Sequence, residues 1–183
     1  MQDAPPKPPG YMTATPCAQT LTRLELALIR VWEAFSRWAT ELNTAVSGEP
    51  FGFQDVVVLH AIRMRQGPRN LTEVLRFLNR SDVSNIQYSL RKLERAGLVR
   101  RSAGATKRES SYALTPLGTE VTDRFSARRQ ELLVGLAGEV LDFAPQMERA
   151  AAVLERLVGL YDQSTQSVLN ERIVGRADET RTE

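Results

Sequence analysis

The stretch between residues 71 and 114 constrains the fold most, because it combines two short helices with two strands. Apolar residues at helical spacing predict one helix over residues 71–78 and a second from about 82 to 96. Only three residues, 79–81, separate the two helices. Such a short connection turns the second helix sharply against the first, as in a helix-turn-helix.

Local signals mark both ends of the second helix and a hairpin after it. Asp82 is expected to cap its first turn, and Gly97 to end it in a left-handed conformation. Two short runs, residues 98–102 and 110–114, then predict a β-hairpin around a basic loop that contains glycine. The centre of the chain is therefore expected to be a helix-turn-helix followed by a hairpin.

Longer helices are expected on both sides of this centre. Apolar residues recur every three or four positions from Leu21 to Leu42, which predicts a helix starting at Thr20 or Thr22 and ending before a turn at residues 47–50. A second apolar helix is expected over residues 53–65. After the hairpin, a helix from Pro116 to about residue 143, interrupted by Pro145, and a last helix to about residue 168 complete the prediction.

The ends of the chain differ from this helical region. Residues 1–19 hold five of the nine prolines, which predicts a disordered or extended arm, and residues 170–183 are a polar tail. The hydrophobic fraction of 42% is enough for a buried core in between. We expect a mainly α domain with a small β-hairpin, an α+β fold, over residues 20–169, with its centre at about 53–118.

Charge is distributed unevenly along the chain. Residues 63–108 contain twelve Lys and Arg but three Asp and Glu, whereas residues 139–183 contain nine acids and five arginines. A basic centre of this kind indicates a polyanion-binding module, although a solvated basic surface is the simpler alternative.

Several classes of function are disfavoured by what the sequence contains. One Cys and one His exclude a disulfide framework and a multi-histidine metal site within one subunit, so we expect no metal and no cofactor. No apolar stretch is long enough to cross a bilayer, and no signal peptide is recognisable, so a cytoplasmic protein is expected. No nucleophile with a base, phosphate-binding glycine loop or paired carboxylates occurs, so an enzyme is not expected.

The helix expected over residues 82–96 is the best candidate for contact with DNA. Ile86, Leu90 and Leu93 share one face and should point inward, which leaves the other faces polar or basic. An α-helix fits the major groove of B-DNA, and the hairpin tip can reach the adjacent phosphates. The candidate DNA-binding residues on the helix are Ser84, Asn85, Gln87, Tyr88, Arg91 and Lys92, and those at the tip are Lys107 and Arg108.

Residues 93–101, Leu-Glu-Arg-Ala-Gly-Leu-Val-Arg-Arg, and residues 114–118, Leu-Thr-Pro-Leu-Gly, resemble the MarR family of bacterial winged helix-turn-helix regulators. The likeness covers about residues 21–168 and is most specific over 70–118. It implies a homodimer held by interleaved helices, here about 21–46 and 119–169. It also implies repression from pseudo-palindromic DNA sites in the nucleoid, and for many members release of DNA by a small-molecule effector or an oxidant.

The same resemblance assigns roles to individual residues. Asp82, Ser84, Asn85, Gln87 and Tyr88 occupy positions from which the family reads DNA, and Lys107 and Arg108 match its basic wing tip. The sequence departs from the family pattern at Thr106, where an aspartate is common. Two other interpretations stay open, namely a winged-helix module that binds protein and an architectural DNA binder without sequence preference.

Five further residues are functional candidates. Cys17 has no basic neighbour that would lower the pKa of its thiol, so a bystander is favoured over an oxidant sensor. His60 lies within an apolar helix and is expected to be packed rather than a ligand. Trp32, Trp38 and Tyr161 are interpreted as core residues, with a ligand pocket as the alternative.

Overall fold

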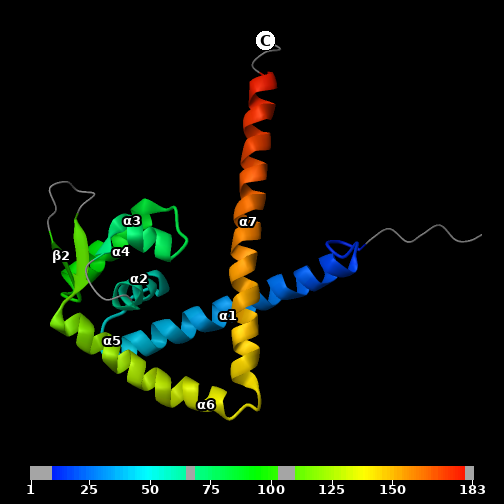
Figure 1. The fold of residues 1–183 in the computed structure, drawn as a ribbon. Coiled ribbons are helices and arrows are strands. Elements are labelled where there is room, and N and C mark those ends of the chain that lie inside the picture. The colour runs from blue at the N-terminus through cyan, green and yellow to red at the C-terminus, as the bar shows by residue number, and fades with distance from the viewer. Residues whose placement is uncertain (1–9, 65–68, 103–109, 180–183) are drawn as a thin grey trace, which may run out of the picture. The chain divides into compact units, whose positions relative to one another are not determined.

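The computed structural model of the chain describes residues 10–64, 69–102 and 110–179 (Figure 1), with side chains described up to residue 172. It divides into two compact units, residues 1–128 and 129–183, each of which has its own internal packing. The first unit holds the helix-turn-helix and the strands. The second is entirely helical over its described residues, apart from a short turn before its last helix.

The predicted helices and the two hairpin strands occur in the predicted order, and β1, a π-helical turn and α6 are additional elements. Those of the first unit are α1 (Pro16–Ser47), α2 (Phe53–Met64), β1 (Arg69–Asn70), α3 (Leu71–Phe77), α4 (Val83–Arg95), β2 (Val99–Ser102), β3 (Ser111–Leu114) and α5 (Pro116–Arg129). The second unit contains a π-helical turn (Gln130–Val134), α6 (Gly135–Gly138) and α7 (Phe143–Glu179). No helix among the described residues is long and apolar enough to cross a membrane.

The predicted hairpin is present, but it belongs to a three-stranded antiparallel sheet in the order β1-β3-β2. Val99 pairs with Leu114 and Ser102 with Ser111, and β1 adds Arg69 opposite Tyr112. The prediction missed β1 because a strand of two residues has no hydrophobic periodicity to detect. Its partner strand lies far along the chain, so the pairing is a tertiary contact.

The core of the first unit is formed by α2, α3, α4, α5, the sheet and the C-terminal part of α1 (Figure 1). Val58, Leu59, Ile86, Leu90 and Leu93 have no solvent exposure. Fully burying one such side chain contributes about 1.5–3 kcal/mol. The inward face predicted for the helix at residues 82–96 is thereby confirmed.

His60 lies in α2 beside this core, as its apolar surroundings predicted. Its ring is 4.3 Å from that of Phe125, centroid to centroid, and its Nε2 atom is buried without a hydrogen-bond partner among the described residues. Burial disfavours the charged imidazolium and lowers the pKa of His60 from 6.5 to about 4. His60 is therefore a packed, neutral histidine near pH 7.

This histidine should make stability depend on pH. Between pH 6.5 and 4 the unfolded chain binds a proton at His60 that the folded chain does not, so stability falls as the pH is lowered. The expected loss from pH 7 to pH 5 is on the order of 2 kcal/mol more in the wild-type protein than in His60→Gln. Urea unfolding of both proteins at the two pH values measures it. Equal losses in the two proteins would contradict the assignment.

The first helix begins earlier than predicted. Thr15, rather than Thr20 or Thr22, is the N-cap, because its hydroxyl accepts a hydrogen bond from the Ala18 amide at 3.1 Å. Pro16 occupies the first turn, where a missing amide hydrogen costs nothing. The capping-box spacing at Thr22 was misleading, and the last residues of the predicted arm are helical.

The helices after the sheet also differ from the prediction. The helix expected to reach residue 143 changes at Gln130 into a π-helical turn, and α6 ends at Gly138, so the break precedes Pro145. Pro145 lies in the first turn of α7, a position that tolerates proline. Helix α7 then continues to Glu179, so the segment predicted as a polar tail from residue 170 is helical up to there.

Candidate nucleic-acid interface

Helix α4 presents most of the predicted DNA-binding residues on one polar side. Ser84, Asn85, Tyr88 and Arg91 are exposed, and Gln87 is half-buried. Ser89, which the sequence did not single out, is buried and accepts a hydrogen bond from Gln54 Nε2 of α2 at 3.3 Å. This contact and the apolar inward face together pack α4 against α2.

The turn before α4 is organised by an ion pair. Asn79 adopts a left-handed conformation with φ 49°, and Arg80 then forms a bidentate pair with Asp82 two residues later. The Arg80 Nε atom lies 2.7 Å from Asp82 Oδ1, and its Nη2 donates to Asp82 Oδ2. The same Nη2 also donates to Gln54 Oε1 at 3.2 Å, which connects this turn to α2.

Asp82 does not cap α4, contrary to the prediction. It precedes the helix without any side-chain hydrogen bond to the free backbone amides, because its carboxylate accepts from Arg80 and from Asn85 Nδ2 instead. The hydrogen bonds from Arg80 and then Asn85 hold the pKa of Asp82 well below its usual range. The carboxylate is thus ionised and occupied by neighbours in the same turn and helix.

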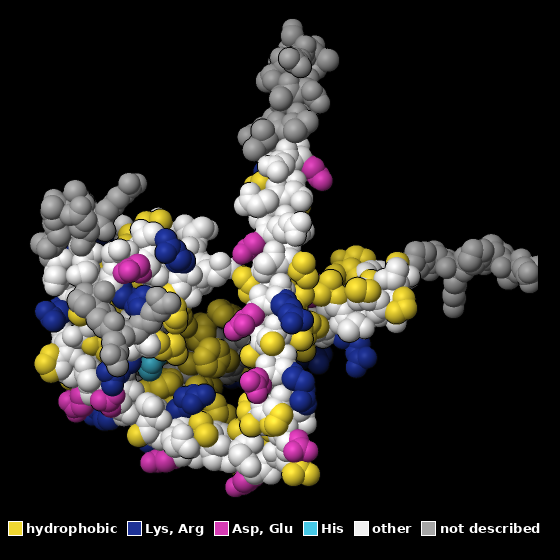
Figure 2. Space-filling view, in the orientation of Figure 1, with side chains coloured by type: hydrophobic (Ala, Val, Ile, Leu, Met, Phe, Trp, Pro, Cys, Tyr) yellow, Lys and Arg dark blue, Asp and Glu magenta, His cyan; other side chains and the backbone are white. Residues whose placement is uncertain are grey.

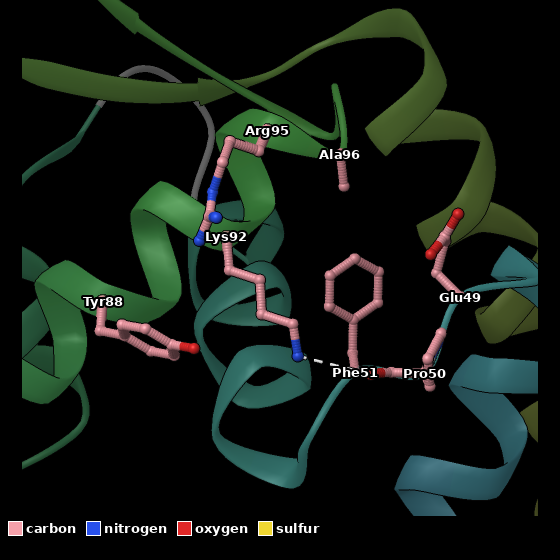
Figure 3. A pocket seen from close by; sticks show the side chains of 7 residues that line it. All are labelled: Glu49, Pro50, Phe51, Tyr88, Lys92, Arg95 and Ala96. Carbon is pink, nitrogen blue, oxygen red and sulfur yellow. Dashed lines mark hydrogen bonds between the residues drawn. The ribbon is translucent and has the colours of Figure 1, made fainter.

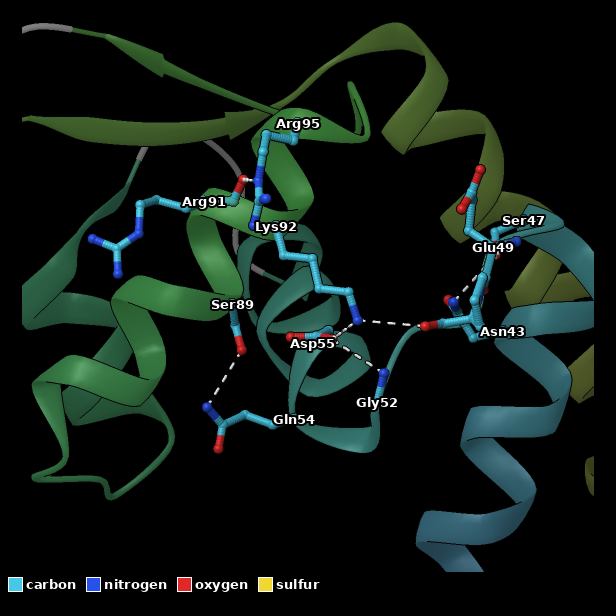
Figure 4. Close-up of polar contacts among 11 residues, drawn as sticks. Asn43, Ser47, Glu49, Gly52, Gln54, Asp55, Ser89, Arg91, Lys92 and Arg95 are labelled. Atoms are coloured by element: carbon cyan, nitrogen blue, oxygen red, sulfur yellow. Dashed lines mark hydrogen bonds and ion pairs between the residues drawn. The ribbon is translucent and has the colours of Figure 1, made fainter.

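Lys92 turns back toward α2 instead of outward (Figure 4). Its Nζ is 2.8 Å from Oδ2 of the buried Asp55 and 3.4 Å from the Pro50 carbonyl oxygen. It also lies 5.2 Å from the centre of the Phe51 ring. Of the two predicted cations at this end of α4, Arg91 is exposed and points away from this cluster, whereas Lys92 is engaged within the unit.

A hollow of about 420 Å³ lies beside this side of α4 (Figure 3). Its lining consists of Glu49, Pro50, Phe51, Tyr88, Lys92, Arg95 and Ala96. It mixes aromatic rings with two cations and one carboxylate. Because Lys92 and Phe51 both line it, the hollow is shaped by the same contacts that fix α4 against the start of α2.

The hairpin adds further basic residues next to α4. Arg100 and Arg101 are exposed on β2, and Arg101 donates to the Ser110 hydroxyl at 2.9 Å. Lys107 and Arg108, which were predicted to form the basic tip, and Thr106 beside them lie outside the described residues. For the hairpin, the described residues are therefore those of strands β2 and β3.

The other candidate residues lie elsewhere. Trp32, Phe35 and Trp38 of α1 form ring contacts with Phe53 and Phe125, and Cys17 is exposed near the start of the same helix. Tyr161 belongs to α7 of the second unit. Over the described part of the chain, no group of three or more His, Cys, Asp and Glu side chains is placed to hold a metal ion.

Three residues important for this surface were missed from the sequence, namely Gln54, Asp55 and Arg80. The sequence did contain a signal for the ion pair between Arg80 and Asp82, because opposite charges two residues apart in a short turn can contact each other. No local signal indicated that Asp55 would meet Lys92, because the two lie 37 positions apart and meet through tertiary packing.

Residues 51–118, which contain all of these elements from α2 to the start of α5, match the family model described as a winged helix DNA-binding domain. Residues 51–118 therefore fold as a winged helix domain. Its predicted fold class is confirmed, with α4 as the second helix of the helix-turn-helix and β2 and β3 as the wing.

Solved structures extend the likeness beyond this winged helix domain. A MarR family transcriptional regulator from Silicibacter pomeroyi is 20% identical, covers 82% of this chain and 96% of its own, and has a TM-score of 0.60. The regulator BldR from Sulfolobus solfataricus is 19% identical, and the match covers 78% of this chain and 99% of BldR with a TM-score of 0.62. The M. tuberculosis regulator MosR, solved in complex with DNA, is 19% identical. The match covers 73% of this chain and 94% of MosR, with a TM-score of 0.57.

These likenesses confirm that the chain has the fold of the MarR-family regulators, as residues 93–118 indicated. The shares covered are larger than the winged helix domain alone, so helices outside residues 51–118 take part in the common fold. No curated protein is similar enough in sequence to count as a relative.

Proposed function

We propose that the protein is a dimeric transcriptional regulator that binds specific double-stranded DNA sequences and acts as a repressor. The observation that carries the proposal is the exposed, polar and basic side of α4 within a winged helix DNA-binding domain. The fold shared with a regulator solved on DNA supports it.

Within this proposal the residues divide into two roles. We assign contacts with base edges in the major groove to the polar side chains of Ser84, Asn85 and Gln87 on α4. Arg91 and Arg100 are exposed cations that suit phosphates, which position the protein without reading sequence. We keep Lys107 and Arg108 as proposed contacts of the wing tip.

Exposed apolar side chains support a dimer. On α1, Ile29, Val31 and Trp32 are 60%, 64% and 55% exposed, and Figure 2 shows hydrophobic side chains along this helix. Similar exposed residues on α7 are Met147, Val153, Val158, Leu160 and Val168. Large apolar patches mark interaction sites, and a second copy is the partner we propose for both helices. Two recognition helices about 34 Å apart then read successive major grooves on one face of the duplex.

Fluorescence anisotropy tests the proposal. The labelled duplex is taken from upstream of the protein's own gene, competed with random duplex and titrated at two salt concentrations, while sedimentation gives the stoichiometry. Tight binding that resists random competitor, with two subunits per site, is expected. Binding abolished by random duplex favours an architectural role, and no salt-sensitive binding to any duplex overturns the proposal in favour of a protein-binding module.

Substitutions on α4 should separate the two roles. Arg91→Ala is expected to weaken binding to all duplexes about equally and to reduce the salt slope by about 1, because it removes one phosphate contact. Gln87→Ala should instead cost about 1–3 kcal/mol at particular base pairs. Arg63→Ala, which removes a half-exposed cation of α2 outside α1, α4, α7 and the hairpin, is the control for charge alone and should leave affinity unchanged. Identical behaviour of Arg91→Ala and Gln87→Ala on matched and mismatched duplexes would show that the roles are wrong.

A further inference from the structure

We infer that Arg80 and Asp82 are positioning residues that fix the direction of the Asn85 side-chain amide, and that this makes Asn85 a reader of adenine. The inference rests on the proposed function, since it concerns how α4 reads DNA. It changes the role of Asp82 from a contact with DNA to a support for one.

The direction of the amide follows from the chemistry of its partner. Asn85 Nδ2 lies 3.0 Å from Asp82 Oδ2. An ionised carboxylate only accepts hydrogen bonds, so the amide nitrogen must face it, and the reversed amide would place two oxygens in repulsive contact. One of the two Nδ2 hydrogens is thereby used, and Oδ1 and the other hydrogen remain for a ligand.

Asp82 is itself held in place from two sides. Arg80 donates hydrogen bonds to both carboxylate oxygens of Asp82, and its guanidinium also donates to Gln54 Oε1 of α2. Gln54 in turn donates to Ser89, which is buried in α4 one turn beyond Asn85. With three hydrogen bonds already accepted, the carboxylate has little capacity left for a base. Arg80 also neutralises its charge, which removes the repulsion that a bare carboxylate would exert on phosphates.

The groups that Asn85 keeps match adenine. In the major groove adenine offers the N7 acceptor and the N6 amino donor, which pair with one amide N–H and one amide oxygen. Guanine offers two acceptors, N7 and O6, which an unrestrained asparagine can meet with both of its N–H groups. Because Asp82 already takes one N–H of Asn85, the guanine mode is blocked and the adenine mode is retained.

The test uses the full chain and a pool of duplexes with a randomised central segment, selected by binding and sequenced. The wild-type protein is expected to enrich a motif with adenine at one position of each half-site. Asn85→Ala should lose the preference at that position alone, and Asp82→Asn should lose adenine-over-guanine discrimination at the same position by roughly tenfold. Gln87→Ala is the matched control on α4 and should alter a different position.

Two further measurements separate positioning from a structural role. On duplexes that differ only by adenine or guanine at that position, Arg80→Ala should also reduce discrimination, and Asp82→Asn should add no further loss in an Asn85→Ala background. Affinity for random duplex should stay equal or rise in Asp82→Asn, since a negative charge is removed. Thermal melting by circular dichroism checks that each variant is folded. If Asp82→Asn does not fold, Arg80→Ala replaces it as the variant in which discrimination between adenine and guanine is measured.

The outcomes distinguish the inference from the proposed function. If the wild-type protein enriches a motif but Asn85→Ala leaves every position unchanged, or Asp82→Asn changes a position other than that of Asn85, the inference is overturned and the proposed function stands. A motif without adenine at the Asn85 position overturns it as well. If the wild-type protein enriches no motif and shows no salt-dependent binding, the proposed function fails.

Discussion

Replacing Gly118 with alanine is expected to lower the free energy of unfolding by about 3 kcal/mol or more, because no room exists for a methyl group. A Cβ atom at Gly118 would lie 2.0 Å from the Leu98 carbonyl oxygen and 2.9 Å from its carbonyl carbon. Both are backbone atoms at the junction of α4 and β2, so no side-chain rotation relieves the clash. The start of α5 would have to move away from the sheet.

Urea unfolding followed by circular dichroism measures this loss. Gly159→Ala in α7 is the control, since nothing lies within 4 Å of its Cβ position and the helix interior favours alanine. That variant should be as stable as the wild-type protein or slightly more stable. A Gly118→Ala protein with wild-type stability would show that α5 does not pack on Leu98 as described.

Asp55→Ala is expected to destabilise the protein by about 2 kcal/mol, because it leaves a partly buried lysine without its partner. Asp55 is 6% exposed, and its Oδ2 accepts both from Lys92 Nζ at 2.8 Å and from the Gly52 amide at 3.1 Å. Removing one partner of a buried ion pair costs about 3–5 kcal/mol when burial is complete. The Lys92 side chain is 33% exposed, so water offsets part of this cost.

A second ion pair of the same fold provides the comparison. Asp123 contacts Arg63 at 2.6 Å, but both side chains are about half exposed, so Asp123→Ala should cost less than about 1 kcal/mol. Adding Lys92→Met to Asp55→Ala should recover much of the lost stability, because the unpaired cation is then absent. Equal effects of Asp55→Ala and Asp123→Ala in urea unfolding would refute a structural role for the buried pair.

The Asp55–Lys92 pair also shows where interpretation of the sequence is incomplete. Helical periodicity places Lys92 on the polar side of a helix in a basic region, and a contact with DNA is the natural prediction from that position. Whether such a side chain extends outward depends on an acceptor from another element. Here that acceptor comes from α2, so packing determines what Lys92 contacts.

The turn before α4 illustrates the same limit over a shorter range. Asp82 stands at a position where aspartate commonly caps a helix, and that preference predicts a cap. Arg80 and Asn85 offer the carboxylate other partners than the free amides. The pair with Arg80 and the hydrogen bond from Asn85 occupy both carboxylate oxygens, and the side-chain cap is absent.

Local sequence was sufficient to specify the helix-turn-helix, the wing and the face that α4 buries. These depend on periodicity, on Gly97 with its φ of 70° and on Thr115-Pro116, all of which act within a few residues. The short strand β1, the direction of Lys92 and the network that holds Asp82 depended instead on how the chain packs. Each of these requires an atom from another segment, and periodicity carries no information about which distant segments meet.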